Sequence, residues 1–298
     1  MKKEFLTGIL LVVAGAICFG SLSTVVSLAR KEGYDVPSIT FAQVLLGFLV
    51  LVLLNLLPRP AKGPSNTFSG KDILKVMLHG VCVGLISTFY ILSVRYGSAA
   101  VSIVLLAQSV WMSIVLEAVP ARTFPSLKKI VAAVVILAGT LLATNVLFRS
   151  SVSIAPAGMV YGLLAAVANT ASIYCSGRIV TGKAPLRRTL YLGMGCLLVV
   201  SLVWGPALLR HFDSSILWSW GWALALVGMV LPTLLYIKGM PVIGIGLSAI
   251  VTCLQIPVSA LLAFIVLGEP VSGYQWLGLL LIAGSIIGMH MPWKIAGR

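Results

Sequence analysis

Two glutamines, Gln108 and Gln255, are the polar residues whose spacing is most suggestive of a binding site. Each lies in an apolar stretch, 11 residues after a glycine, Gly97 or Gly244. A side-chain amide both donates and accepts hydrogen bonds, so two amides facing one cavity would hold a polar solute. The alternative is that each amide makes an interhelical hydrogen bond, which contributes about 1 kcal/mol or less in an apolar environment.

Aromatic and amide side chains in the same kind of stretch extend this candidate site. Trp111 follows Gln108 by three residues, which places both on one face of a helix. Aromatic faces combined with a few amides suit an amphipathic organic solute. The other candidates for the wall of a substrate cavity are Gln43, Tyr90, Asn169, Tyr174 and Tyr236.

Two titratable residues are candidates for proton coupling. Glu117 lies near the end of an apolar stretch, just before Arg122 and Lys129, so it is either a protonatable gate or an interfacial carboxylate paired with a base. His79 lies inside an apolar stretch. Imidazole titrates near neutral pH, which suits a proton relay, but a neutral imidazole bonded to a neighbouring helix is the alternative.

The sequence contains no pattern for a metal site, a cofactor or an ATP motor. No histidine has a second ligand at metal-binding spacing, and no phosphate-binding GxxxxGK[ST] loop is present. The five cysteines form no CxxC pair and are interpreted as small packing residues. We therefore expect no metal, no cofactor and no enzymatic activity.

Composition shows which elements must position these residues. Of the 298 residues, 59% are hydrophobic and 9% are charged, against roughly 25% charged in an average soluble domain. Ten stretches of 19 residues or more lack Asp, Glu, Lys and Arg: 5–29, 36–58, 76–94, 96–116, 130–148, 150–177, 189–209, 214–237, 239–268 and 270–293. Because about 20 apolar residues cross a bilayer, we predict an all-α membrane protein with ten transmembrane helices.

The distribution of Lys and Arg predicts the orientation. With a cytoplasmic N-terminus, 16 bases fall on inside segments and 5 on outside segments, which places both termini inside. The formal net charge of +14 then reflects topology, and we expect contact with the lipid bilayer and none with nucleic acid.

The two halves of the chain resemble each other weakly and in order. Tyr90 precedes Gln108 as Tyr236 precedes Gln255, and Ile136–Gly139 matches Leu281–Gly284. Residues 1–149 and 150–298 would each hold five helices, so the second half is inverted in the membrane. Inverted repeats are typical of secondary transporters, which bind substrate near the midplane.

Several segments resemble the EamA family of the drug/metabolite transporter superfamily. They are Gly8, Phe19-Gly20-Ser21, Pro257, Leu267-Gly268-Glu269-Pro270, Gln275-Trp276-Leu277-Gly278 and Ile282-Ala283-Gly284. The resemblance spans essentially the whole chain. It implies a carrier of the bacterial inner membrane that moves small metabolites, often outward, without ATP. The chain departs from the family pattern at Arg122, where the second half has Glu269, at Gln43, where arginine is common, and at Val110, the counterpart of Pro257.

The sequence therefore predicts a secondary transporter that works by alternating access and, from the resemblance, exports amino acids or related solutes. An uptake permease, a lipid-linked flippase and a non-transporting membrane sensor or assembly protein are the alternatives. No base is expected inside the membrane to hold a lipid phosphate. Pro257 is a candidate hinge, and Gly80-xxx-Gly84 and Gly284-xxx-Gly288 predict close helix contacts, within the chain or in a homodimer.

Overall fold

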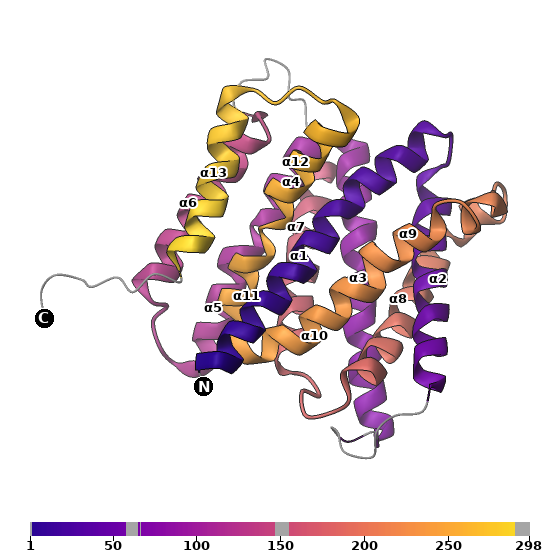
Figure 1. Ribbon diagram of the computed structural model, residues 1–298, viewed down its shortest axis with the longest axis horizontal. Helices are drawn as coiled ribbons and strands as arrows, with labels where there is room; N and C mark the ends of the chain where they lie inside the picture. Colours follow the sequence, from indigo (N-terminus) through magenta and orange to yellow (C-terminus); the bar gives the residue numbers. More distant parts are fainter. Residues whose placement is uncertain (1, 58–64, 66, 147–154, 290–298) are drawn as a thin grey trace, which may run out of the picture.

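The computed structural model describes residues 2–57, 65, 67–146 and 155–289, and these residues form a bundle of helices (Figure 1). The first half contains α1 (Lys2–Lys31), α2 (Val36–Leu56), α3 (Gly70–Tyr96), α4 (Ala99–Ala107), α5 (Ser109–Ala121) and α6 (Leu127–Ala143). The second half contains α7 (Pro156–Arg178), α8 (Pro185–Leu208), η2 (Ser214–Leu217), α9 (Gly221–Ala225), η3 (Leu226–Val230), α10 (Leu231–Ile243), α11 (Ile245–Thr252), α12 (Gln255–Leu267) and α13 (Gly273–Gly288). The expected boundary at residues 149–150 lies outside the described residues.

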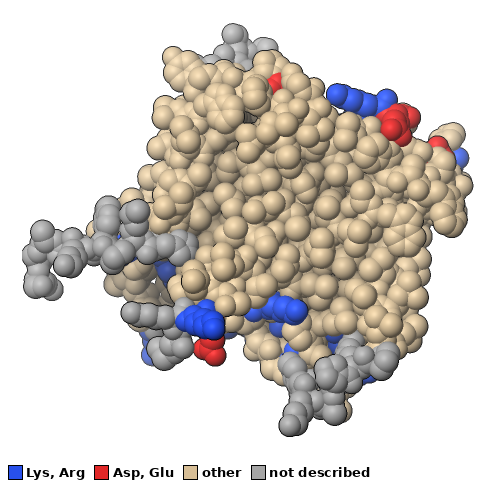
Figure 2. Space-filling model, viewed as in Figure 1, with Lys and Arg blue, Asp and Glu red and all other residues tan. Residues whose placement is uncertain are grey.

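Eight of the described helices are long and apolar enough to cross a membrane, counting α4–α5, α9–α10 and α11–α12 as one each. Helix α13, with 16 residues, and α6, with 17, are shorter. On the face shown in Figure 2, the charged side chains gather near two opposite edges, and a broad band between them shows none. The chain is therefore a helical multi-pass membrane protein, whereas the count of ten spans stays a prediction.

Local sequence signals define several helix ends. Asp35 caps α2 by accepting a hydrogen bond from the Ser38 amide at 3.3 Å. Helices α3 and α13 begin with capping boxes formed by Ser69 with Asp72 and by Ser272 with Gln275. Gly268 ends α12 with a φ of +69°, a left-handed conformation that glycine adopts without steric cost.

The main helix contacts join the first half of the chain to the second. Helix α1 packs along α10 and α12, α7 along α3 and α4, α2 along α8, and α6 along α13. The α6–α13 pair forms one side of the bundle in Figure 1. If each helix is replaced by its expected counterpart in the other half, the contact of α1 with α10 becomes that of α7 with α3, while the α2–α8 and α6–α13 contacts stay the same. An internal repeat would produce this relation. The repeat itself stays a prediction.

Glycines allow the closest of these contacts. A Cβ atom on Gly80 would lie 1.9 Å from the carbonyl oxygen of Leu192, and one on Gly195 would lie 2.0 Å from that of Met77, so α3 and α8 touch through their backbones. Apart from α13 itself, nothing among the described residues lies within 4 Å of where a Cβ atom on Gly284 or Gly288 would be. The first predicted glycine face thus makes an internal helix contact, and the second makes none with the described residues.

Candidate functional site

Two helices are interrupted at corresponding places in the two halves. Helix α4 ends at Ala107 and α5 begins at Ser109, so Gln108 occupies the first break. Helix α11 ends at Thr252 and α12 begins at Gln255, which places Gln255 at the second break. Nothing in the sequence indicated the first break, whereas Pro257, the candidate hinge, lies just after the second.

The backbone stays hydrogen-bonded through both breaks. The backbone amide of Gln108 donates to the Leu105 carbonyl at 3.1 Å, and that of Cys253 donates to the Ile250 carbonyl at 3.2 Å. Each break is therefore a short, tighter turn within one membrane span.

The first break is held by hydrogen bonds from neighbouring residues. Gln108 Nε2 donates to the Val104 carbonyl at 3.1 Å, and Trp111 Nε1 donates to Gln108 Oε1 at 3.0 Å. Asn169 Nδ2 of α7 donates to Ser109 Oγ at 2.9 Å. Gln108, Trp111 and Asn169, all predicted from the sequence, thus lie together, but the Gln108 amide is engaged mainly within its own helix.

The second break has a free amide and a buried hydroxyl beside it. Among the described residues, the half-buried Gln255 side chain makes no hydrogen bond, and the Gln255 carbonyl lies 2.8 Å from where a Cβ of Gly20 would be. The Tyr236 hydroxyl is buried without a partner in the described structure. Its ring lies against Gly15 of α1. Tyr90, its expected counterpart in α3, is half-buried.

A cavity of about 260 Å³ lies between α5, α7 and the start of α11. It is lined by Leu116, Glu117, Pro120, Tyr174, Arg178 and Ile245. Two predicted site residues, Glu117 and Tyr174, therefore share one cavity. Its wall carries the carboxylate of Glu117 and the guanidinium of Arg178 beside apolar side chains.

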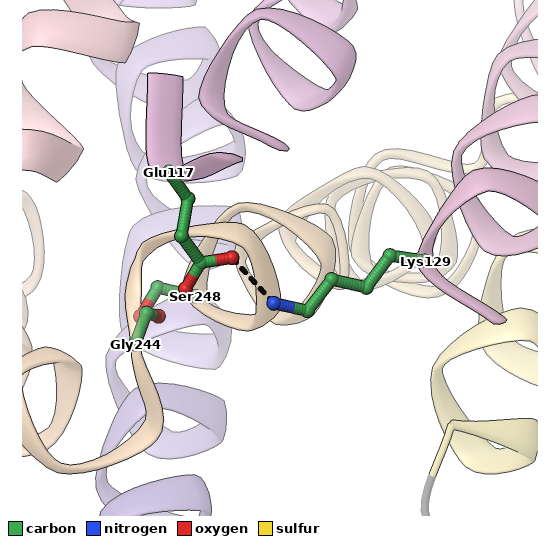
Figure 3. Close-up of polar contacts among 4 residues, drawn as sticks. All are labelled: Glu117, Lys129, Gly244 and Ser248. Carbon is green, nitrogen blue, oxygen red and sulfur yellow. Dashed lines mark hydrogen bonds and ion pairs between the residues drawn. The ribbon is translucent and has the colours of Figure 1, made fainter. Parts of the chain in front are cut away.

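Glu117 connects three helices at this cavity. Its carboxylate forms an ion pair with Lys129 of α6, and the two side chains are 22% and 25% exposed. The same carboxylate lies close to Gly244 (Figure 3). A Cβ atom on Gly244 or Gly246 would come within 2.8 or 2.6 Å of its oxygens. This region is also where α10 passes into α11, so the ion pair lies within the first half of the chain and its carboxylate contacts the second half.

Apolar side chains fill the space among the helices that carry the two breaks. One buried cluster takes residues from α1, α5, α7, α10 and α11, including Val12, Ile114, Ile173, Met240 and Ile250. These side chains contact one another directly. The space among these helices is therefore packed with apolar side chains in the described conformation.

The remaining predicted residues lie at helix contacts. Gln43 of α2 lies against Gly228 in η3, a π-helical turn of the α9–α10 segment, and such turns are often found at functional sites. His79 Nε2 lies 3.2 Å from Ser172 Oγ and 3.3 Å from Ser176 Oγ of α7. Pro257 is the third residue of α12 and so directly follows the second break.

Sequence reasoning missed Arg188. It is one of the 16 bases that the predicted topology places on inside segments, and it stands beside Arg187 and near Lys183. In the structure Arg188 belongs to the first turn of α8 and is 2% exposed. A base is therefore buried within the helix bundle, close to one end of α8, and the expectation that no base lies inside the membrane stays a prediction. When two bases are adjacent in the sequence, the sequence does not show which of them is buried. The packing of α8 determines that Arg188 is.

No group of three His, Cys, Asp or Glu side chains suited to a metal ion occurs among the described residues. The sequence-based expectation of no cofactor stays a prediction.

Comparison with known proteins gives three findings. The sequence model of the EamA-like transporter family matches residues 6–145 and 156–291. A Salmonella typhimurium protein named "Uncharacterized inner membrane transporter YicL" is 25% identical over 283 residues, which cover 94% of each chain. A solved structure described as "Crystal structure of protein" has a TM-score of 0.74 at 16% identity, covering 95% of this chain and 96% of that one, and shares its fold.

Proposed function

Because the chain belongs to the EamA-like transporter family and is a membrane transporter, we propose that it exports amino acids or related small organic solutes by alternating access. It needs no ATP motor and no cofactor, and none of its residues is assigned a catalytic role. The name of its Salmonella relative supports placing it in the inner membrane of a bacterium.

The paired interruptions at Gln108 and Gln255 are the observation that carries this proposal. At both breaks the backbone amides still bond carbonyls of the same helix, as Gln108 does to Leu105 and Ile256 to Cys253, so the glutamine side chains are the groups that would contact a solute. Here they stand 147 residues apart, in segments that the repeat would relate. Gln255 offers an amide that no described residue occupies. We assign it the main contact with solute and Gln108 the weaker one.

The ion pair of Glu117 with Lys129, named here the inner gate pair, closes the cytoplasmic side in this proposal. The pair joins α5 to α6, and the Glu117 carboxylate contacts the α10–α11 junction. The bias of Lys and Arg toward the predicted inside segments supports assigning that end of the bundle to the cytoplasm. The gate would open when the pair separates. Protonation of Glu117 would weaken it, which makes proton coupling through this residue a part of the proposal.

The ten spans and the two inverted repeats belong to the same proposal. Counting each interrupted helix once, the described elements supply α1, α2, α3, α4–α5 and α6, and then α7, α8, α9–α10, α11–α12 and α13. An odd number of spans in each half inverts the second half. Alternating access would then be a rocking movement of α1 and α7 across the halves they contact.

The test is flux of a labelled amino-acid mixture in proteoliposomes, measured in both directions, with and without an imposed pH gradient. We expect saturable flux in the wild type, loss of nearly all of it in Gln255→Ala and a smaller decrease in Gln108→Ala. Gln275→Ala is the matched control. Gln275 lies at the start of α13, away from both breaks, and its side-chain amide donates to the Ala143 carbonyl at the end of α6. Each variant is compared per amount of monodisperse protein.

The outcomes separate the parts of the proposal. Normal flux in both glutamine variants would contradict the site assignment alone. Inward flux that exceeds outward flux at equal gradients would indicate an uptake permease. Flux that is the same with and without the pH gradient would contradict proton coupling. If no labelled solute crosses in the wild type, amino acids are the wrong substrate class.

A further inference from the structure

Arg188 is a buried cation that lacks a counterion in the described structure. Its guanidinium donates one hydrogen bond, from Nη2 to the Ser176 carbonyl at 3.2 Å, and its Nε atom is buried without a partner. Among the described residues no carboxylate forms an ion pair with it. Removing an ion from water is unfavourable unless an opposite charge and hydrogen bonds compensate.

The acids of the chain are engaged or exposed elsewhere. Glu117 pairs with Lys129, and Glu32 accepts from Trp220 Nε1 at 2.7 Å. Asp72 and Asp213 cap the starts of helical segments. The Ser176 carbonyl, near the C-terminal end of α7, offers only part of a negative charge to Arg188. This neutral carbonyl accepts one of the hydrogen bonds that the guanidinium can donate, and the Nε donor stays without a partner in the described structure.

The neighbours of Arg188 are further polar groups. We name Arg188, His79, Ser172 and Ser176 the buried basic cluster, which comes from α8, α3 and α7. His79 Nε2 bridges the two serine hydroxyls at 3.2 and 3.3 Å. Arg188, His79 and Ser176 are 2%, 3% and 5% exposed. A guanidinium, an imidazole and two hydroxyls, with no acid among them, are the groups that hold an oxyanion.

We propose that the buried basic cluster binds an oxyanionic group, the carboxylate of the transported solute. The planar fork of arginine matches the two oxygens of a carboxylate, and Nε is one of the donors that such a pair uses. A serine hydroxyl would supply a further donor. The proposal rests on the proposed transport function and names the part of the solute that this cluster recognises.

Helix α7 connects the buried basic cluster to the cavity. Tyr174 and Arg178 line the cavity, whereas Ser172 and Ser176 contact His79 from the other side of the same helix. A rotation or displacement of α7 during the transport cycle would bring the two sites together. The contacts of α7 with α3 and α4, which join the halves of the chain, are among those that alternating access must change.

The direct test is thermal unfolding of the purified full-length protein in a neutral detergent. Potassium acetate is the probe, and acetamide at equal ionic strength is its neutral counterpart. At ten times the acetate dissociation constant we expect the wild-type midpoint to rise by about 2–4 °C, with no rise in acetamide. Arg188→Lys keeps the charge but loses the fork, so its response should be smaller, and Arg188→Met should not respond.

Arg95→Met, which removes an exposed arginine at the end of α3, is the matched control and should respond as the wild type does. An undiminished acetate response in Arg188→Met would overturn the proposal, as would an equal response to acetamide. A response to phosphatidylglycerol in mixed micelles without one to acetate would assign the cluster to a lipid headgroup and overturn the solute assignment. If Arg188→Met does not fold, the comparison of wild type with Arg188→Lys decides.

Transport separates failure of this inference from failure of the proposed function. In proteoliposomes, free amino acids should inhibit labelled flux at least tenfold better than their carboxamides, and Arg188→Lys should reduce that ratio. Wild-type flux with the same ratio in the variant would contradict this inference alone. Absent wild-type flux would contradict the proposed substrates, while an Arg188-dependent acetate shift would still support the anion site.

Discussion

At the scale of single residues, the structure distinguishes polar groups that sequence position makes equivalent. Gln108 and Gln255 follow their glycines at the same spacing, but the first amide bonds Val104 and Trp111 and the second is free among the described residues. Glu117 has several bases near it in sequence, and it pairs with Lys129. In each case the partner of the side chain depends on which neighbouring residues the packing of the helices brings close to it.

Neutralising the inner gate pair is the first prediction at this scale. Glu117→Gln or Lys129→Gln leaves one partly buried charge without its partner, and we expect each change to lower flux about tenfold. The double variant should lose less than the product of the two, because it leaves no unpaired charge. The measurement is initial flux, with the neighbouring Lys128→Gln as the control. Independent effects of the two changes would show that the pair is not a functional unit.

Gly80 gives a second prediction at this scale. A methyl group there would approach the Leu192 carbonyl oxygen to 1.9 Å, so Gly80→Ala must separate α3 from α8. We expect a loss of about 1–3 kcal/mol in the free energy of unfolding, measured by thermal or denaturant unfolding in detergent.

Gly284→Ala serves as the control for that change. Apart from α13 itself, nothing among the described residues lies near where a Cβ atom on Gly284 would be, so alanine should be neutral or stabilise α13 by up to about 1 kcal/mol. Equal destabilisation of both variants would mean that Gly284 also packs against a helix, which only a second copy of the chain or residues outside the described part could supply.

At the scale of elements, the two helix breaks, between α4 and α5 and between α11 and α12, have different causes. Pro257 cannot donate a backbone hydrogen bond to the Cys253 carbonyl one turn earlier, and this accounts for the α11–α12 break. Its counterpart Val110 is not a proline, yet α4 and α5 are also interrupted. There Asn169 of α7 binds Ser109, so tertiary contacts stabilise the first break.

Replacing Pro257 tests whether the second break serves as a hinge. Pro257→Ala restores a backbone donor, so α11 and α12 should join, thermal stability should hold or rise, and flux should fall several-fold. Pro206→Ala, inside α8 and away from both breaks, should leave flux unchanged. Flux that is unaltered in Pro257→Ala, measured at equal protein density, would remove the hinge from the proposed mechanism.

At the scale of the whole molecule, the packing of one half against the other has consequences for orientation. The α2–α3 and α7–α8 connections meet where Lys183 Nζ donates to the Thr67 carbonyl at 2.7 Å. The α1–α2 turn meets the α8–α9 connection where Tyr34 bonds Ser215 at 2.8 Å. These contacts hold each set of connections at its own end of the bundle, and the proposed topology assigns the first end to the cytoplasm.

Cysteine labelling of intact cells tests that assignment. In a variant without the native cysteines, Ser214→Cys should react with an impermeant thiol reagent from outside. Phe124→Cys, at a fully exposed position between α5 and α6, should react only after permeabilisation. The opposite pattern would invert the orientation, and labelling of both positions from outside would mean an even number of spans between them.

The sequence by itself determined that the chain is a helical membrane protein, because the shortage of charges and the length of its apolar stretches follow from the solvent alone. It also predicted Gln108, Trp111 and Asn169, which lie together, and Glu117 and Tyr174, which share a cavity. These residues were found because polar groups in apolar helices are few.

Only the tertiary structure decided which of these groups are already engaged, where the helices break and which base is buried. Arg188 and Arg187 are neighbours in a basic segment, and the sequence treats them alike. The direction in which each faces depends on how α8 packs against α3, through backbone contacts at Gly80 and Gly195. Such contacts join residues more than a hundred positions apart, so no local pattern of the chain contains them.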